Sequence, residues 1–234
     1  MTETLTVASY NVHSCVGLDG VLAPERIVKV LAEIDADVVA LQELGSRRTG
    51  AENQFRHLGH ALGMEGVYDS ELMPIPVPFG NAILVRGKVS DARVVDLSIG
   101  RFEPRKAIDA RLKVGNRILR CITTHLGLRP LERRRQVALM QAALEDPQHT
   151  ADATLVLGDF NVIGPERRIL ARIGASRRGP RMPTWPSDRP LLSIDKIWTL
   201  PPALLADLQV HRSALARVAS DHLPIVGRIR FDSA

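Results

Sequence analysis

Short apolar runs that end in polar clusters predict a chain rich in β-strands. Residues from Leu5 to Asn11 alternate between apolar and polar, which predicts a strand that brings Asn11 to its carboxyl end. The apolar run 37–42 is typical of a buried strand, and Glu43 follows it directly. Between these strands, apolar residues recur at helical spacing after a proline suited to a first helical turn, and they predict a helix containing Pro24, Ile27, Val28, Leu31 and Ile34.

The middle of the chain continues with strand patterns separated by short connections. Four of them follow one another as antiparallel strands would, over residues 81–86, 89–98, 106–114 and 117–124, and His125 follows the last. Helical spacing is found over residues 52–62, 131–144 and 165–173, whereas the proline-rich stretch 71–79 predicts a loop. The three consecutive arginines that open the 131–144 helix, Arg133 to Arg135, are interpreted as a solvated face.

The segment Leu155–Asn161 combines a buried strand with two polar side chains at its end. Asp159 and Asn161 are two positions apart, so on an extended backbone both side chains lie on one face, and Phe160 points to the other. A carboxylate beside an amide can hold a hard cation, orient a water molecule or bind a phosphoryl oxygen. Ordinary turn chemistry is the alternative, because Asp and Asn are common where strands end.

Two late segments place further titratable side chains next to strands. Asp195 begins the strand pattern 194–198, and Asp221 and His222 come directly before the buried pattern 223–226. The loop 176–190 carries four arginines and Trp185, so it could contact phosphates and stack a ring, or it could simply be a solvated loop.

Composition limits the class of protein. With 234 residues and 45% apolar content, the chain is expected to form one domain over residues 1–234. No apolar run approaches the ~20 residues of a membrane-spanning helix, no secretory leader pattern opens the chain, and two cysteines, Cys15 and Cys121, make no disulfide framework. These features predict a soluble, cytoplasmic protein.

The net charge of +5 and the 26 arginines suit a polyanionic or phosphorylated partner. Coding bias in an arginine-rich genome explains the same composition equally well.

Taken in order, the polar clusters at the strand ends resemble those of the endonuclease/exonuclease/phosphatase superfamily, which has the deoxyribonuclease I-like fold. The resemblance extends from Tyr10 to Val226 and depends on the ordered set Asn11, Gln42-Glu43, Thr124-His125, Gly158-Asp159-Phe160-Asn161, Asp195 and Ser220-Asp221-His222. It implies an α/β fold in which two mixed sheets pack as a four-layer α/β/β/α sandwich. It also implies a metal-dependent phosphodiesterase, a hydrolase of the nuclease and phosphatase type.

The resemblance also implies a role for each matched residue. Glu43 would be the principal Mg²⁺ ligand, Asn11 would assist it, and Asp221 would lie beside the metal. The remaining catalytic residues would be Asp159 and Asn161, which hold or polarise the attacking water, Asp195, which orients His222, and His125, which faces the phosphate.

Metal chemistry agrees with this reading. Magnesium keeps several waters, so one or two carboxylates suffice to bind it, and the lack of a Cys/His cluster argues against zinc. Mg²⁺ is therefore the expected cofactor, with Mn²⁺ as a possible substitute. Whether His222 or Asp159 accepts the proton of the water stays open.

Departures from the family pattern bear on the substrate. Apurinic/apyrimidinic endonucleases of the superfamily usually carry tyrosine at the position of His125, and no glutamate between residues 80 and 105 matches the partner of that histidine in deoxyribonuclease I-like enzymes. Arg105 resembles the phosphate-facing arginine of the lipid- and sugar-phosphate branches, and Thr184 could add a hydroxyl to the phosphate.

Nucleic acid is the first expected substrate because of the basic surface and the arginine-rich loop 176–190, which would make the enzyme an endonuclease or exonuclease. A phospholipid or sugar phosphate is the alternative. A scaffold that kept the fold without activity would be expected to have lost the metal ligands, and these are present.

Overall fold

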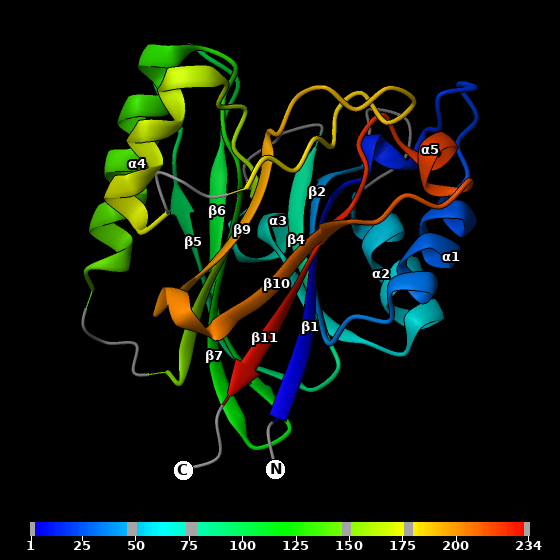
Figure 1. Ribbon diagram of the computed structural model, residues 1–234, viewed down its shortest axis with the longest axis horizontal. Coiled ribbons are helices and arrows are strands. Elements are labelled where there is room, and N and C mark those ends of the chain that lie inside the picture. Colours follow the sequence, from blue (N-terminus) through cyan, green and yellow to red (C-terminus); the bar gives the residue numbers. More distant parts are fainter. Residues whose placement is uncertain (1–2, 46–50, 74–78, 147–150, 176–179, 232–234) are drawn as a thin grey trace.

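Two β-sheets pack face to face and carry helices on their outer surfaces (Figure 1). The computed structural model describes residues 3–45, 51–73, 79–146, 151–175 and 180–231. The six-stranded sheet has the order β10-β11-β1-β2-β4-β3, with β1 Glu3–Asn11, β2 Val38–Leu44, β3 Glu65–Tyr68, β4 Gly80–Val85, β10 Leu205–Val210 and β11 Ile225–Phe231. The five-stranded sheet has the order β5-β6-β7-β8-β9, with β5 Lys88–Asp96, β6 Lys106–Val114, β7 Arg117–His125, β8 Ala153–Asp159 and β9 Asp195–Leu200.

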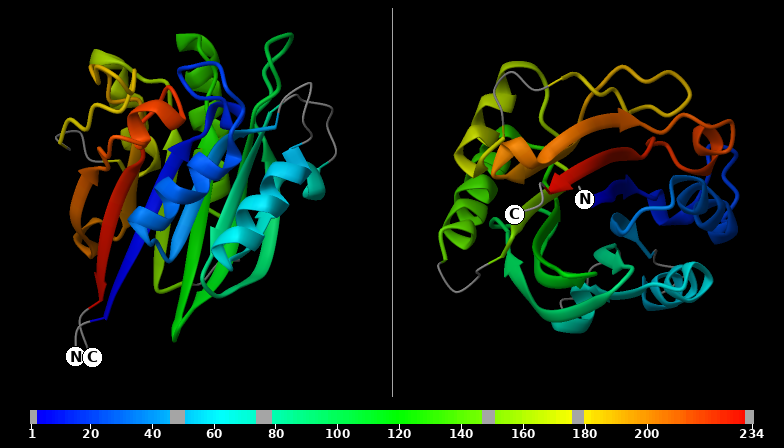
Figure 2. Two further views of the ribbon diagram at one scale, coloured as in Figure 1. Left: turned by 90° about the vertical axis from the view of Figure 1, so that its right-hand side faces the viewer. Right: turned by 60° about the horizontal axis from the view of Figure 1, so that its bottom comes forward.

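Helices cover both outer faces. The longer ones are α1 Pro24–Ile34, α2 Ala51–Leu62 and α4 Pro130–Leu144, and the shorter ones are α3 Asp69–Leu72 and α5 Ala216–Ala219. The described residues also form three 3-10 helices: η1 His13–Cys15, η2 Gly164–Ile173 and η3 Pro202–Leu204. Helices α1 and α2 lie against the six-stranded sheet, and α4 and η2 against the other (Figures 1 and 2). Within the described residues, no helix is long and apolar enough to span a membrane.

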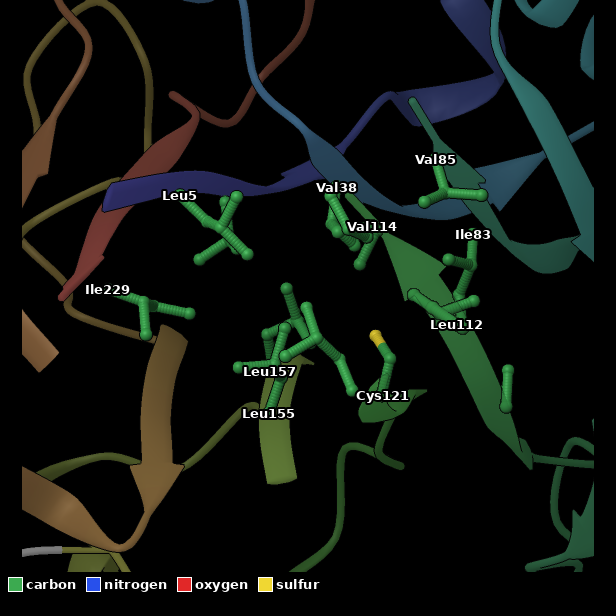
Figure 3. Packing of buried hydrophobic residues seen from close by; sticks show 14 of the residues in the cluster. Leu5, Val38, Ile83, Val85, Leu112, Val114, Cys121, Leu155, Leu157 and Ile229 are labelled. Carbon is green, nitrogen blue, oxygen red and sulfur yellow. The ribbon is translucent and has the colours of Figure 1, made fainter. Parts of the chain in front are cut away.

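Three apolar layers fill the space between these elements. The central layer lies between the sheets, where Leu5, Val38 and Ile83 of one sheet face Leu112, Leu155 and others of the second (Figure 3). A second layer joins the six-stranded sheet to α1 and α2, and a third joins the five-stranded sheet to α4 and η2. The four-layer α/β/β/α sandwich expected from the sequence is confirmed.

The pairing of strands brings one end of both sheets together. Strands β1 and β2 are parallel, with Asn11 beside Gln42, and β7 and β8 are parallel, with His125 beside Asp159. Strand β9 runs antiparallel to β8, so that Asp195 at its start lies beside Asp159. We call the end of the sheets at which β1, β2, β7 and β8 finish the site end; it is at the top of Figure 1.

Some local expectations were wrong. The segment expected as a loop over 71–79 begins inside α3, and its residues 74–78 lie outside the described part. The strand pattern 81–86 is β4, which pairs with β2 and β3 rather than with its successor β5. Arg133 is not solvated: it is buried, donating to both carboxylate oxygens of Glu166 and to the carbonyl of Gly127.

An ion cluster beneath α4 fixes β6 against its neighbours. The buried carboxylate of Asp109 accepts bonds from Arg120 (2.9 and 2.8 Å) and from Arg93 (3.1 and 2.9 Å). Burial by itself would raise the pKa of Asp109, but the two guanidinium groups outweigh it and hold that pKa below its usual range. The carboxylate therefore stays charged in the folded protein at neutral pH.

Replacement of Asp109 by Asn is expected to lower the free energy of unfolding by about 3 kcal/mol at pH 7, because the buried Arg120 loses its counter-charge. The pKa of Asp109 is lower in the folded than in the unfolded chain. The stabilisation is therefore complete above the unfolded value of about 3.9 and is lost as pH falls through the folded value. Urea unfolding at pH 7 and at pH 3 measures both effects. Asp91→Asn, an exposed change on the adjacent β5, serves as the control; equal unfolding energies for the two variants at pH 7 would contradict the prediction.

Candidate active site

A pocket of about 490 Å³ opens at the site end, between the two sheets. Its polar lining comes from segments far apart in the sequence: Glu43, Glu103, Arg105, His125, Asp159, Asn161 and His222. Its apolar wall consists of Phe79, Leu128, Ile163, Trp185, Leu192 and Ile194. Most of the residues that the sequence proposed for chemistry thus line one cavity, because parallel strands deliver their carboxyl ends to the same edge.

Asp159 lies close to three other polar side chains of the site. Its buried Oδ2 accepts a bond from Asn11 Nδ2 (3.2 Å) and lies 3.5 Å from His125 Nε2 and 3.7 Å from His222 Nε2. Burial, and next the charge of Asp195, raise the pKa of Asp159 to about 7, although His222 and the bond from Asn11 lower it. At neutral pH this carboxyl group is therefore able both to bind and to release a proton.

Asp195 holds His222 in a fixed orientation. Its Oδ2 accepts a bond from His222 Nδ1 (2.9 Å), so that Nε2 of the ring faces Asp159. Burial lowers the pKa of His222, but the charge of Asp195 and this hydrogen bond outweigh it and raise the pKa to about 10. The imidazole is therefore a protonated donor at neutral pH.

Thr184 is placed differently from the sequence expectation. Instead of offering its hydroxyl to a phosphate, it is fully buried, absent from the pocket lining, and donates to Asp195 Oδ2 (2.5 Å). One oxygen of Asp195 thus accepts bonds from both Thr184 and His222. An isolated β-bridge between Trp185 and Leu192 holds the loop close to the start of β9 and so places Thr184 beside Asp195. No local sequence signal indicates this bridge.

Because Thr184 contacts Asp195 and not the pocket, Thr184→Val is expected to lower kcat for the phosphodiester hydrolysis that the family resemblance implies by about tenfold, the equivalent of one lost hydrogen bond to a charged group. KM should change little, since the side chain does not reach the pocket, and the pH profile should shift because His222 depends on Asp195. Thr184→Ser keeps the hydroxyl and should recover most of the rate. A valine variant with wild-type kcat and pH profile would contradict this role.

Glu43 is aimed at the pocket by an irregularity in β2. The register between β2 and β4 shifts between Leu41 and Leu44, and Glu43 adopts a positive φ of 56°. Such a bulge turns one side chain out of the alternation of its strand. Asn11 then donates to Glu43 Oε1 (2.8 Å) from the same amide nitrogen that contacts Asp159, so one side chain positions two carboxylates.

The donor atoms of the site fit a hard divalent cation. Glu43 and Asp159 offer carboxylate oxygens with lone pairs beyond those used by Asn11, and a ligand atom each from Asp159, Asp195 and His222 lie within 4.8 Å of one another. The buried Oδ1 of Asp195 has no hydrogen-bond partner. The pocket lining contains no sulfur ligand, so its chemistry matches Mg²⁺ or Mn²⁺ better than a soft metal.

On the other side of Asp159, His125 is held neutral. Burial, then the charges of Arg105 and His222, lower its pKa well below the usual value. Arg105 Nη1 lies 3.0 Å from His125 Nδ1, and a guanidinium can only donate, so Nδ1 accepts. The other ring nitrogen, Nε2, lies 3.1 Å from the amide nitrogen of Asn161 and 3.5 Å from Asp159 Oδ2. Asn161, which has a positive φ of 52°, donates its amide to the carbonyl of Leu126 (2.9 Å) beside the same ring.

The contacts of two pocket residues were not predicted from the sequence, although Trp185 was expected there as a ring that could stack. Glu103 binds Arg105 Nη2 (2.6 Å), two residues along the same loop, so that the arginine is presented to the opening. Trp185 forms part of the apolar wall, and its Nε1 donates to Asp221 Oδ2 (3.2 Å). Asp221 does not line the pocket: its contacts are Trp185 and His13, whose Nδ1 is 3.8 Å away, so the structure does not place it with Asp159.

Comparisons with known proteins agree with this geometry. The family model described as the Endonuclease/Exonuclease/phosphatase family matches residues 8–222. A search of the curated proteins finds no match. Among solved structures, a protein of this family from Bacteroides thetaiotaomicron superposes with a TM-score of 0.78 at 18% identity, over 100% of both chains.

Two other structural relatives extend the comparison. A family protein from Beutenbergia cavernae matches with a TM-score of 0.75 at 20% identity, covering 99% of this chain and 72% of the other. TDP2 from D. rerio, solved with a single-strand DNA product, matches with a TM-score of 0.71 at 18% identity, over 97% and 98% of the two chains. Identities this low support a shared fold, and the family model spans nearly the whole chain. This chain therefore belongs to the Endonuclease/Exonuclease/phosphatase family of phosphoric ester hydrolases.

Proposed function

We propose that the protein is a Mg²⁺-dependent phosphodiesterase in which Mn²⁺ can replace Mg²⁺. The observation that supports this most directly is the bridging amide of Asn11, which holds Glu43 and Asp159 side by side while His222 approaches from the side of Asp195. Glu43 would hold the ion, which would neutralise phosphate oxygens and lower the barrier to attack on an anionic ester.

The side chains supply the remaining steps. Arg105, aligned by Glu103, would bind non-bridging phosphate oxygens. Asp159, with a pKa near 7, would accept the proton of the attacking water as its oxygen bonds to phosphorus. His222, with a pKa near 10, would donate its proton as the bond to the leaving oxygen breaks. This division of roles assigns the base to Asp159 and the acid to His222.

Nucleic acid is one substrate class that the surface supports. A groove of about 780 Å³ adjoins the pocket, shares Ile163 and Leu192 with it, and is lined by Arg167, Arg168 and Arg181. Arginines along a groove suit successive phosphates of one strand. Two arginines of the loop 176–190, Arg177 and Arg178, lie outside the described residues.

A phospholipid is the second class, and the wall of the pocket supports it. Six of the lining residues are apolar, including Leu128 and Ile163 at the rim. Such a wall suits the glycerol or acyl portion beside a headgroup phosphate better than it suits a hydrated sugar.

The activity itself is tested with bis(p-nitrophenyl) phosphate in Mg²⁺, Mn²⁺ or EDTA, followed by plasmid DNA, single-stranded RNA, phospholipid vesicles and a sugar phosphate. We expect turnover of the chromogenic diester with either metal and none in EDTA. Turnover that survives exhaustive EDTA treatment, or no hydrolysis of any substrate with either metal, would refute the proposal.

A further inference from the structure

Exposed apolar side chains are gathered at the site end. Of the eleven large apolar residues that are exposed in the described chain, only Leu139 lies elsewhere, on the outer face of α4. The other ten lie in segments that join the strands at the site end. Seven are in loops and three are in helices α3, α4 and α5: Leu18, Val21, Leu22, Leu72, Phe102, Leu128, Leu131, Ile163, Leu191 and Val218. Single exposed apolar residues are normal, but such clustering on one end marks an interaction surface.

Nine of these ten residues, all except Leu72, form two patches that flank the opening. The α4-side patch consists of Phe102, Leu128, Leu131, Ile163 and Leu191, with Leu131 71% and Leu191 77% exposed. Leu128 and Ile163 belong at once to this patch and to the wall of the catalytic pocket, and Ile163 and Leu191 line the adjoining groove. The α5-side patch consists of Leu18, Val21, Leu22 and Val218, in which the amide of Leu18 donates to the carbonyl of Val218 (3.0 Å).

Positive charge accompanies the α4-side patch. Arg101, Arg129, Arg168 and Arg181 are exposed in its segments, and the guanidinium of Arg129 lies 5.0 Å from the centre of the Phe102 ring. Two carboxylates of the same segments are already neutralised, since Glu103 binds Arg105 and Glu166 binds the buried Arg133. The surface around the apolar residues is therefore basic.

An anionic lipid surface satisfies both properties. Leucine, isoleucine and phenylalanine side chains enter the boundary between headgroups and acyl chains, while arginines bind the lipid phosphates. A nucleic-acid strand would gain from the arginines, but its bases stack on aromatic rings, and Phe102 is the single aromatic residue of the two patches. The aliphatic residues thus favour a membrane over a polynucleotide.

We infer that the site end docks on an anionic phospholipid surface, so that the diester of a lipid headgroup enters the pocket between the two patches. The identity of the cleaved bond rests on the proposed phosphodiesterase activity, whereas the docking does not. Strand β1 begins and β11 ends at the opposite end of the sheets, beside the N and C labels of Figure 2, so neither of these strand ends lies at the docked end.

Docking is measured by co-sedimentation in EDTA with vesicles of phosphatidylcholine, with or without phosphatidylglycerol. We expect binding to the anionic vesicles, at least about tenfold weaker binding in the double variant L18S/L131S, which changes one residue of each patch, and unchanged binding in Leu139→Ser. Leu139 lies on the same helix as Leu131 but away from the patches, so it controls for a general loss of apolar surface. All three proteins should hydrolyse bis(p-nitrophenyl) phosphate equally, because none of the changed residues lines the catalytic pocket.

Several outcomes would overturn the inference. Wild-type protein that stays in the supernatant with anionic vesicles would do so, as would a double variant that binds like wild type. Weaker binding of a single-stranded oligonucleotide by the double variant, with vesicles not bound, would assign the patches to nucleic acid, and loss of a wild-type dimer would assign them to a second copy of the chain. Binding to vesicles without any diester hydrolysis would instead refute the proposed function and leave the docking intact.

Discussion

His222→Ala is expected to lower kcat for bis(p-nitrophenyl) phosphate by about 10³-fold with saturating Mg²⁺, within the range for loss of a general acid. Nε2 of the His222 ring lies 3.7 Å from Asp159 Oδ2. The raised pKa of His222 keeps the ring protonated at neutral pH, so it can donate. Steady-state rates at pH 7 measure the effect. A variant that retains more than about a tenth of the wild-type rate would remove His222 from the chemistry.

The same substitution should also destabilise the fold. Asp195 is fully buried, and without His222 its carboxylate keeps the hydroxyl of Thr184 as a hydrogen-bond partner but loses its counter-charge. The loss of this counter-charge is expected to lower the free energy of unfolding by about 3 kcal/mol. Because the pKa of His222 rises from about 6.5 to about 10 on folding, the stabilisation from its charge is complete below pH 6.5 and lost as pH rises through 10. The double variant H222A/D195N removes the buried charge; it should recover stability without recovering activity.

Glu43→Gln is expected to reduce activity by about 10² to 10³-fold and to abolish stabilisation by Mg²⁺. A ligand that binds only the folded state stabilises it by about 2.7 kcal/mol at 100 times its dissociation constant. Wild-type protein should therefore show a rise in Tm with Mg²⁺, and the variant should not, because the amide removes the negative charge that we propose as the ligand of the ion. Thermal unfolding with Mg²⁺ and with EDTA measures the difference without any need for turnover.

Glu103→Gln is the matched control for Glu43→Gln. Glu103 lines the same pocket, but its carboxylate is bound by Arg105 at 2.6 Å. It should respond to Mg²⁺ like wild type, with weaker substrate binding because Arg105 loses its alignment. Equal Mg²⁺ stabilisation of the Glu43 and Glu103 variants would show that the ion is held elsewhere.

The fold and the centre of the site were accessible from the sequence because they depend on local patterns. The strands that end at Asn11 and Asp159 can be recognised from the spacing of their apolar residues and from the polar residue at their end. Parallel pairing with the neighbouring strands brings these ends to the same edge. The order of these clusters also indicated the family, which the family model confirms.

The details that failed depend on contacts between distant segments. Nothing near Thr184 in the sequence shows that its hydroxyl is taken by Asp195, and nothing near Arg133 shows that Glu166 lies above it. Glu43 was expected just beyond its strand, whereas a bulge within β2 aims it at the pocket. Each of these contacts forms only when distant segments pack together, and burial then fixes a polar side chain against one particular partner.

The position of β1 between β2 and β11 has a consequence for biosynthesis. One edge of β1 pairs with Val38 and its neighbours soon after synthesis, but the other edge waits for Ile225 to Phe231. At a translation rate of about 5–20 residues per second, that edge stays open for roughly ten seconds or more and is a target for chaperones or for aggregation. His222 lies three residues before this late strand, so a nascent chain completes the contact between His222 and Asp195 only in the step that closes the sheet.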